Sequence, residues 1–262
     1  MKLTYYIHGE TSNLQAALQD VKYPLLVLDP FCGVGNSCKK NLEFLGVTSC
    51  LLQPSHLGAP GQRTQYGWDL LAELKQTQGE FPLSAQLVAD ALIPSDGDGE
   101  KLAHEITMHV LLFAIETTWF RDFAEMCNWL ASCSIRNLIF FWHCAYQENS
   151  HLSYLVSQQV TEEAWLAAEN VLKKRLHIFK NPGVAMLFTR SGFSLSSICA
   201  NPRQAVFLAP GVNDTMNGEM MMLYQFLFRV LHDLAEYRGL SPHCLVPKIN
   251  MADGSLHEFF PV

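Results

Sequence analysis

Three groups of side chains in this sequence could carry out chemistry, and the first is a cysteine at an expected helix start. Cys38 follows Gly35-Asn36-Ser37, a position where a helix dipole lowers a thiol pKa and where cysteine hydrolases keep their nucleophile. His143, at the end of an expected strand, could serve as its base. However, Lys39 and Lys40 put the next residues on a solvated helix face, and no Asn or Asp is placed to orient the histidine. We therefore expect an ordinary thiol and no catalytic residue.

The second group offers metal-ligating side chains. His104, Glu105 and His109 fall in a segment that we expect to be a strand, where positions five apart point to opposite faces. The two histidines would then not converge on one ion. Asp96 and Asp98 lie in a turn that lacks the glutamate and further oxygen ligands of a calcium loop. We expect no metal site.

The third group is a glycine loop that follows an apolar run. Asp29-Pro30-Phe31-Cys32-Gly33-Val34-Gly35 resembles the cofactor loop of S-adenosylmethionine-dependent methyltransferases, in which glycines let the backbone approach the cofactor. In that fold an acidic residue ends the second strand and holds the ribose hydroxyls, but here the residue is Gln53. A downstream Asn/Asp-Pro-Pro-aromatic motif is also missing. The methyltransferase therefore stands only as the enzyme alternative.

The elements around this loop read as strand, glycine turn, helix and strand. The apolar run 23–28 is short and bounded by Asp29-Pro30, as is typical of a buried strand. Gly33, Gly35 and Asn36 would form a structural turn, with Asn36 or the next serine capping a helix over 38–45. Residues 47–52 then predict a second strand.

The rest of the chain mixes strands and helices. We predict strands over 3–7, 83–94, 102–116, 137–146, 184–188 and 205–209, with 83–94 and 102–116 joined as a hairpin. Helices are predicted over 12–20, 68–76, 119–133, 161–175 and 216–237, the last being the longest. Hairpins together with crossovers indicate an α/β fold with a mixed β-sheet sandwiched by α-helices, in a single domain over 1–262.

Composition excludes several classes of protein. The net charge is −7 and no cluster of Lys or Arg occurs, which argues against binding to a nucleic-acid backbone. The chain is 49% apolar and only 16% charged, so we expect a protein partner to cover part of its surface. The eight cysteines lack the close spacing of a zinc site, and no segment suggests a signal peptide or a membrane span. We expect a cytoplasmic protein.

The order of several short motifs resembles that of a known family. Gly33-Val34-Gly35-Asn36 opens a helix, Tyr146-Gln147 follows a predicted strand, and Pro210-Gly211 precedes a leucine-rich helix. This succession is similar to the family of the second proteasome assembly chaperone. The resemblance implies an α/β sandwich and a non-catalytic protein that binds a sister chaperone as a heterodimer and assists assembly of the proteasome α ring.

Two segments are expected to contact partners. Met221 and Met222 belong to three adjacent methionines, which cannot all face one core and suit adaptable contact surfaces. The apolar tail includes Phe259, Phe260 and Val262. In the resembled family, a tail with a hydrophobic residue, a tyrosine and any last residue inserts between α subunits, but Pro261 stands here in place of the tyrosine.

The leading functional hypothesis is therefore an assembly chaperone that needs no cofactor and is not an enzyme. Its expected partners are the sister chaperone and proteasome α subunits, with no nucleic acid and no membrane insertion. The alternatives are an adaptor or scaffold subunit of another multiprotein machine and the methyltransferase.

Overall fold

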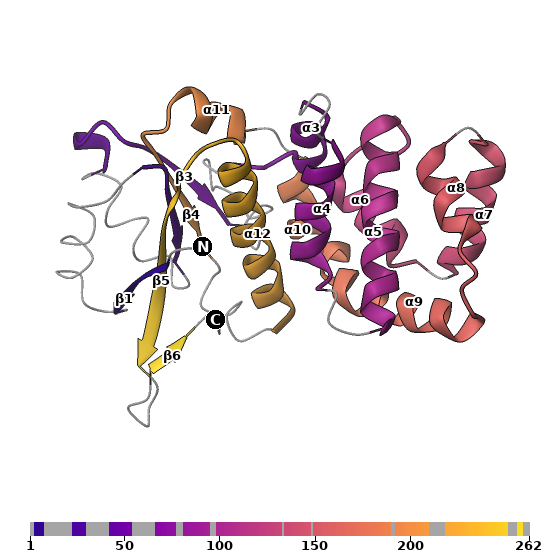
Figure 1. Ribbon diagram of the computed structural model, residues 1–262. Helices are drawn as coiled ribbons and strands as arrows, with labels where there is room; N and C mark the ends of the chain where they lie inside the picture. Colours follow the sequence, from indigo (N-terminus) through magenta and orange to yellow (C-terminus); the bar gives the residue numbers. More distant parts are fainter. Residues whose placement is uncertain are drawn as a thin grey trace. The chain divides into compact units, whose positions relative to one another are not determined.

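The structure is a computed structural model that describes residues 3–7, 23–29, 42–53, 66–76, 81–94, 98–132, 134–147, 149–189, 192–209, 218–250 and 256–258 (Figure 1). Its contacts group the chain into two compact units. One comprises Met1–Gly67 and Ser191–Val262, and the other, Trp68–Arg190, is inserted between these two segments. The assignment of residues 1–262 to a single domain stays a prediction.

The first unit contains the β-sheet. Its strands are β1 (Leu3–Ile7), β2 (Leu25–Leu28), β3 (Thr48–Leu52), β4 (Gln204–Leu208), β5 (His243–Asn250) and β6 (Leu256–Glu258). They are arranged in the order β1-β5-β2-β4-β3, all parallel, and β6 pairs antiparallel with β5. The sheet is therefore mixed, and β2 lies at its centre.

Both faces of the sheet are covered. On one face, Leu25 and Val27 of β2 and Phe207 of β4 pack with Leu42, the first residue of the helical turn at residues 42–44, and with Val47 after it. Helix α12 (Gly218–Tyr237) packs against β2 and β4. Successive strand residues point to opposite faces, and no α12 residue belongs to the cluster around Phe207, so α12 covers the other face. The predicted α/β fold with a mixed sheet sandwiched by helices is confirmed.

Several predicted elements of this unit are confirmed within a few residues. They are β1, β2, β3, β4 and α12, and α12 is the longest helix among the described residues. Short α11 (Leu195–Ala200) and the long strand β5 were not predicted. The Pro247 inside β5 is a strand breaker, which is why the sequence alone does not indicate a strand there.

The second unit is built of helices among the residues that the structure describes. They are α3 (Leu70–Lys75), α4 (Phe81–Leu92), α5 (Asp98–Glu116), α6 (Phe123–Leu130), α7 (Ile135–Ala145), α8 (Ser150–Ser157), α9 (Glu162–Leu176), the 3-10 helix η2 (His177–Lys180) and α10 (Pro182–Thr189). None of the described helices of the chain is both long enough and apolar enough to cross a membrane.

Four predicted strands are wrong, because 83–94, 102–116, 137–146 and 184–188 form α4, α5, α7 and α10. These segments are rich in aromatic and branched residues, which fit a strand as well as a buried helix. Helical spacing is nevertheless present, as in Ala85, Val88, Ala89 and Leu92, all buried on one side of α4. The expected hairpin is therefore a pair of packed helices.

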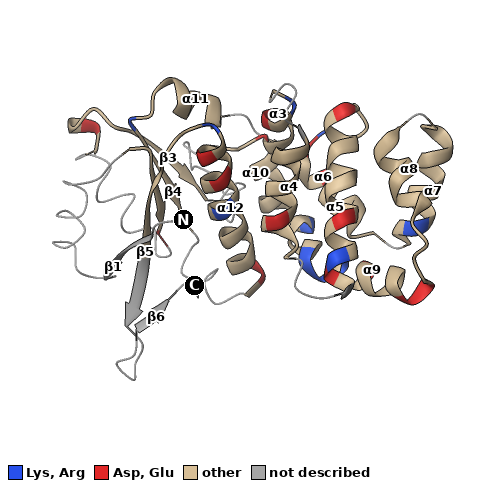
Figure 2. Cartoon of the chain, viewed as in Figure 1, with Lys and Arg blue, Asp and Glu red and all other residues tan. Residues whose placement is uncertain are grey.

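Helix α9 shows why one prediction of this unit is correct. Thr161 caps its first turn, where its side chain accepts a hydrogen bond from the amide of Ala164. The first turn carries Glu162 and Glu163, and the last turn carries Lys173, Lys174 and Arg175 (Figure 2). Negative charge at the start and positive charge at the end of the helix interact favourably with its dipole. These signals are local and need no tertiary contact.

Candidate functional site

The order of the strands places a candidate ligand site at the carboxyl ends of β2 and β4. The chain leaves β2 toward β3 on one side of the sheet and leaves β4 toward β5 on the other side. In open parallel sheets, ligands bind in the crevice where neighbouring connections diverge in this way. The segments that follow the two strands, 30–41 and 210–217, lie outside the described residues.

The three strands at this edge stay paired up to their last residues. The amide of Asp29 donates to the carbonyl of Leu208 at 2.8 Å, and the amide of Ala209 donates to the carbonyl of Leu52 at 3.1 Å. Asp29 is fully buried, and Gln53 at the end of β3 is nearly so. The backbone therefore fixes where the segment after Asp29 begins.

The sequence after β2, whose loop also resembles the cofactor loop of methyltransferases, carries part of a phosphate-binding pattern. Residues 33–40 read GVGNSCKK, against G-x-x-x-x-G-K-[ST] for a phosphate-binding P-loop between a strand and a helix. Gly33 and Lys39 match in type and spacing, whereas Cys38 replaces the second glycine and Lys40 replaces the Ser/Thr. The spacing between Gly33 and Lys39 is the signal that could have pointed to phosphate chemistry.

The structure describes only two of the predicted site residues. Met221 and Met222 lie half-buried near the start of α12, and their role in partner binding stays a prediction. The turn residues Gly33, Gly35 and Asn36, the tail residues Phe259, Phe260 and Val262, and the thiol Cys38 lie outside the described residues.

The histidines considered as metal ligands or as a base have other neighbours. His104 lies on α5, and its Nε2 contacts Oδ1 of Asp90 on α4 at 2.6 Å. Positions five apart on a helix differ by about 140° around its axis, so His104 and His109 diverge for a helical reason and not because of a strand. His143 lies on α7, where its Nδ1 is 3.5 Å from Oγ of Ser153.

The five cysteines that lie in the described part of the chain are free thiols. Burial raises the pKa of Cys50 and Cys127 well above the ordinary value for a thiol, and that of Cys244 to about 12. Cys144 and Cys199 are exposed. A buried thiol with a raised pKa is protonated at neutral pH and is a poor nucleophile, so these three are structural.

One cluster of the described residues has ligand atoms near enough for a metal ion, namely His232, Asp233 and Glu236 on α12. The Nδ1 of His232 contacts Asp233 at 2.8 Å, and its Nε2 contacts Glu236 at 3.3 Å. Because the two carboxylates contact different ring nitrogens, one ion could not replace both contacts. Each ring nitrogen of the buried His232 therefore already has a carboxylate partner, and we assign no metal to the cluster.

A second histidine of α5 makes stability depend on pH. Burial, and to a smaller extent the nearby His151, lower the pKa of His109 to about 4, and its Nδ1 has no hydrogen-bond partner. In the unfolded chain the ordinary pKa is about 6.5. Between these values only the unfolded chain binds the proton, so stability falls as pH falls through this window.

We expect this loss to be roughly 1 kcal/mol, after allowing for the partial exposure of the ring. His109→Gln should remove that part of the pH dependence, as measured by urea unfolding between about pH 7 and pH 4. The exposed Gln86 on α4, replaced by Ala, is the non-titrating control and should leave the pH dependence unchanged. Equal pH profiles for wild type and His109→Gln would contradict the assignment.

Comparison with known proteins gives a fold likeness only. No family model and no curated protein matches the chain. It is similar to the bacterial conjugative coupling protein TrwB in a trigonal form with sulphate, with a TM-score of 0.52, 12% identity, and coverage of 85% of this chain and 63% of that one. An unbound monoclinic form of TrwB gives a TM-score of 0.51, 13% identity, and coverage of 86% and 62%.

TrwB has also been solved in complex with ADP and Mg²⁺, and that form gives a TM-score of 0.48 at 13% identity, covering 86% of this chain and 63% of that one. The chain therefore spans less than two thirds of the length of the coupling proteins that it resembles.

These comparisons correct the functional hypothesis. The solved structures found to share this fold are coupling proteins, so the assembly-chaperone hypothesis is wrong, and the fold likeness lends no support to the adaptor or methyltransferase alternatives. The expectation that the chain is not an enzyme is corrected with it, because that expectation rested on the chaperone resemblance. The fold also gives no support for excluding nucleic acid as a partner.

Proposed function

We propose that this chain binds the phosphate groups of a nucleotide at the carboxyl end of β2, as part of a coupling assembly with other proteins. The observation that carries the proposal is the position of the Gly33–Lys39 pattern. It follows the central strand of a parallel sheet, at the divergence of the β2 and β4 connections, and precedes a helical turn. The fold of TrwB, a protein solved with ADP and Mg²⁺, supports this choice of ligand.

Each residue of the pattern would have a different role in binding phosphate. In the pattern, the glycine at the place of Gly33 is needed so that the backbone amides of the loop can approach phosphate oxygens. The ammonium of Lys39 would neutralise phosphate charge, and the positive end of the following helix would add to this attraction. Cys38 introduces a side chain where the pattern has glycine, so we expect weaker binding than the full pattern provides.

Magnesium fits this edge of the sheet poorly. In P-loop proteins Mg²⁺ is held by the Ser/Thr after the lysine and by an aspartate at the end of a neighbouring strand. Those positions are Lys40, which is itself a cation, and Ala209 at the end of β4. Among the described residues at this edge, the carboxylate is that of Asp29, which is buried. We therefore propose phosphate binding alone and derive no step that involves a metal.

The test is calorimetric titration with ATP and ADP, each with and without Mg²⁺. Lys39→Ala should weaken binding by about tenfold or more, because a charge-assisted contact contributes about 1.5–3 kcal/mol. Lys40→Ala is the matched control, and it should change affinity much less. Cys38→Gly should tighten binding by restoring the pattern.

Two results would overturn the proposal. One is a folded wild-type chain that binds neither nucleotide. The other is an equal loss for Lys39→Ala and Lys40→Ala, which would indicate attraction by net charge alone. Release of inorganic phosphate from ATP, measured in the same samples, shows whether the bound nucleotide is also hydrolysed.

A further inference from the structure

A pocket in the helical unit has features that none of the functions above uses. It is open, has a volume of about 460 Å³, and is lined by Glu116, Thr117, Ala145, Tyr146, Gln147, Asn149 and Ser150. Glu116 is the last residue of α5, and Ala145 is the last residue of α7. Two helix carboxyl ends therefore border the pocket and contribute partial negative charge from their terminal carbonyl groups, whereas the amino end of α8 at Ser150 also borders it and has its first amides capped by Asn149.

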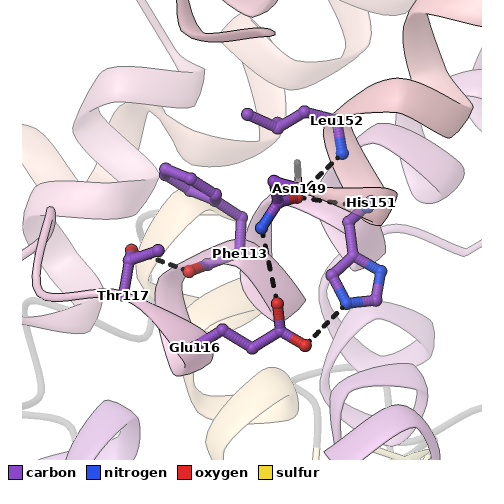
Figure 3. Close-up of polar contacts among 6 residues, drawn as sticks. All are labelled: Phe113, Glu116, Thr117, Asn149, His151 and Leu152. Carbon is purple, nitrogen blue, oxygen red and sulfur yellow. Dashed lines mark hydrogen bonds and ion pairs between the residues drawn. The ribbon is translucent and has the colours of Figure 1, made fainter. Parts of the chain in front are cut away.

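Glu116 is the one charged side chain among the described residues that line the pocket. Its Oε1 contacts Nε2 of His151 at 2.9 Å, and its Oε2 accepts from Nδ2 of Asn149 at 3.4 Å (Figure 3). The orientation of Asn149 is fixed, because its Oδ1 accepts from the amides of His151 and Leu152 at the start of α8. The carboxylate is thus held in position before any ligand arrives.

The carboxylate still has acceptor capacity toward the pocket. A carboxylate offers about four lone-pair positions, of which His151 and Asn149 use two. The Glu116 side chain is 44% exposed, so the remaining positions are open to a ligand. The negative charge of this pocket is therefore preorganised and only partly used.

The neighbouring groups also favour a cation. The ring of Tyr146 lines the pocket and is held edge-on by Phe113 at 5.3 Å and by Trp119 at 5.8 Å between ring centroids. An aromatic ring of this kind attracts a cation over its face.

We propose that the pocket at the carboxyl ends of α5 and α7 binds an organic cation, specifically a guanidinium group. Two planar N–H donors match the two oxygens of Glu116, and the flat group can stack on Tyr146. The guanidinium could belong to an arginine side chain of a peptide or to a free small molecule, and both present the same chemistry. This site lies within the helical unit and does not depend on nucleotide binding.

The experiment titrates the full chain with agmatine and with an end-blocked tripeptide that contains arginine, followed by NMR or calorimetry. Butylurea, which lacks both the guanidinium and the terminal ammonium of agmatine, is the neutral control. We expect saturable binding with a Kd on the order of 1 mM for at least one guanidinium probe. The tighter of the two probes identifies the source of the group.

Glu116→Gln should weaken this binding by about tenfold. Glu105→Gln, on the same helix but outside the pocket, should leave it unchanged. A second variant tests the pocket without disturbing the contact between Glu116 and His151. Gln147→Lys places a tethered ammonium in the pocket and should also weaken binding. Gln147→Met, its uncharged control, should not weaken binding.

The proposal is overturned if butylurea binds as well as agmatine, or if no guanidinium probe saturates. It is equally overturned if Glu116→Gln and Gln147→Lys, both shown to be folded by circular dichroism, bind like the wild type.

Discussion

Replacing Trp142 by alanine is expected to lower the free energy of unfolding of the helical unit by about 3–5 kcal/mol. This tryptophan on α7 is 1% exposed and stacks on Trp129 of α6, with 4.1 Å between centroids and 7° between planes. Phe113, Trp119 and Phe120 contact it at 4.9–5.3 Å. Truncation would leave a cavity at the centre of this aromatic cluster, which its rigid neighbours could not fill.

The neighbouring residue on the same helix supplies the control. Phe141 is 63% exposed, so Phe141→Ala should change stability by no more than about 0.5 kcal/mol. Urea unfolding followed by far-ultraviolet circular dichroism measures both variants without depending on tryptophan fluorescence. Similar losses for the two variants would mean that the packing of α7 differs from the structure described here.

The second large effect is expected in the sheet. Phe207→Ala should also cost about 3–5 kcal/mol, because Phe207 is 1% exposed in β4, between Val27 of β2 and Leu51 of β3. Since β4 also pairs with the last residues of β2, we expect weaker nucleotide binding as well. The measurement is urea unfolding, with nucleotide titration of the fraction that stays folded.

Phe44→Ala is the matched control, because Phe44 lies in the same unit and is 91% exposed. Its stability and nucleotide affinity should stay close to those of the wild type. If Phe207→Ala lost stability but kept full nucleotide affinity, the carboxyl end of β2 would not be the binding site, even though the fold would be confirmed.

The fold determines the position of the candidate nucleotide site, at the carboxyl end of β2, but the phosphate-binding sequence pattern at that position is incomplete. The sheet alone explains why the residue after Leu28 stands at the edge where we propose binding, since the amide of Asp29 is fixed by the carbonyl of Leu208. The replacement of a glycine by Cys38 and of a hydroxyl residue by Lys40 is visible only in the sequence. Together they favour phosphate recognition over metal-assisted chemistry as the first property to measure.

The sequence by itself determined the elements whose signals are local. The strands β2, β3 and β4 are short apolar runs that end at turn residues, and α9 carries a cap at Thr161 and charges that oppose its dipole. The long apolar period of α12 likewise identified a helix. Each of these signals acts within a few residues, so no distant contact was needed to interpret it.

Only the tertiary structure decided the rest. The aromatic run of α7 fits a strand or a helix, and it is a helix because Ile135, Ile139 and Trp142 then share one buried face. Strand order is equally non-local: β5 lies between β1 and β2 although more than 200 residues separate it from either. Both the binding edge at Asp29 and the pocket around Glu116 join residues distant in sequence, so packing alone brings them together.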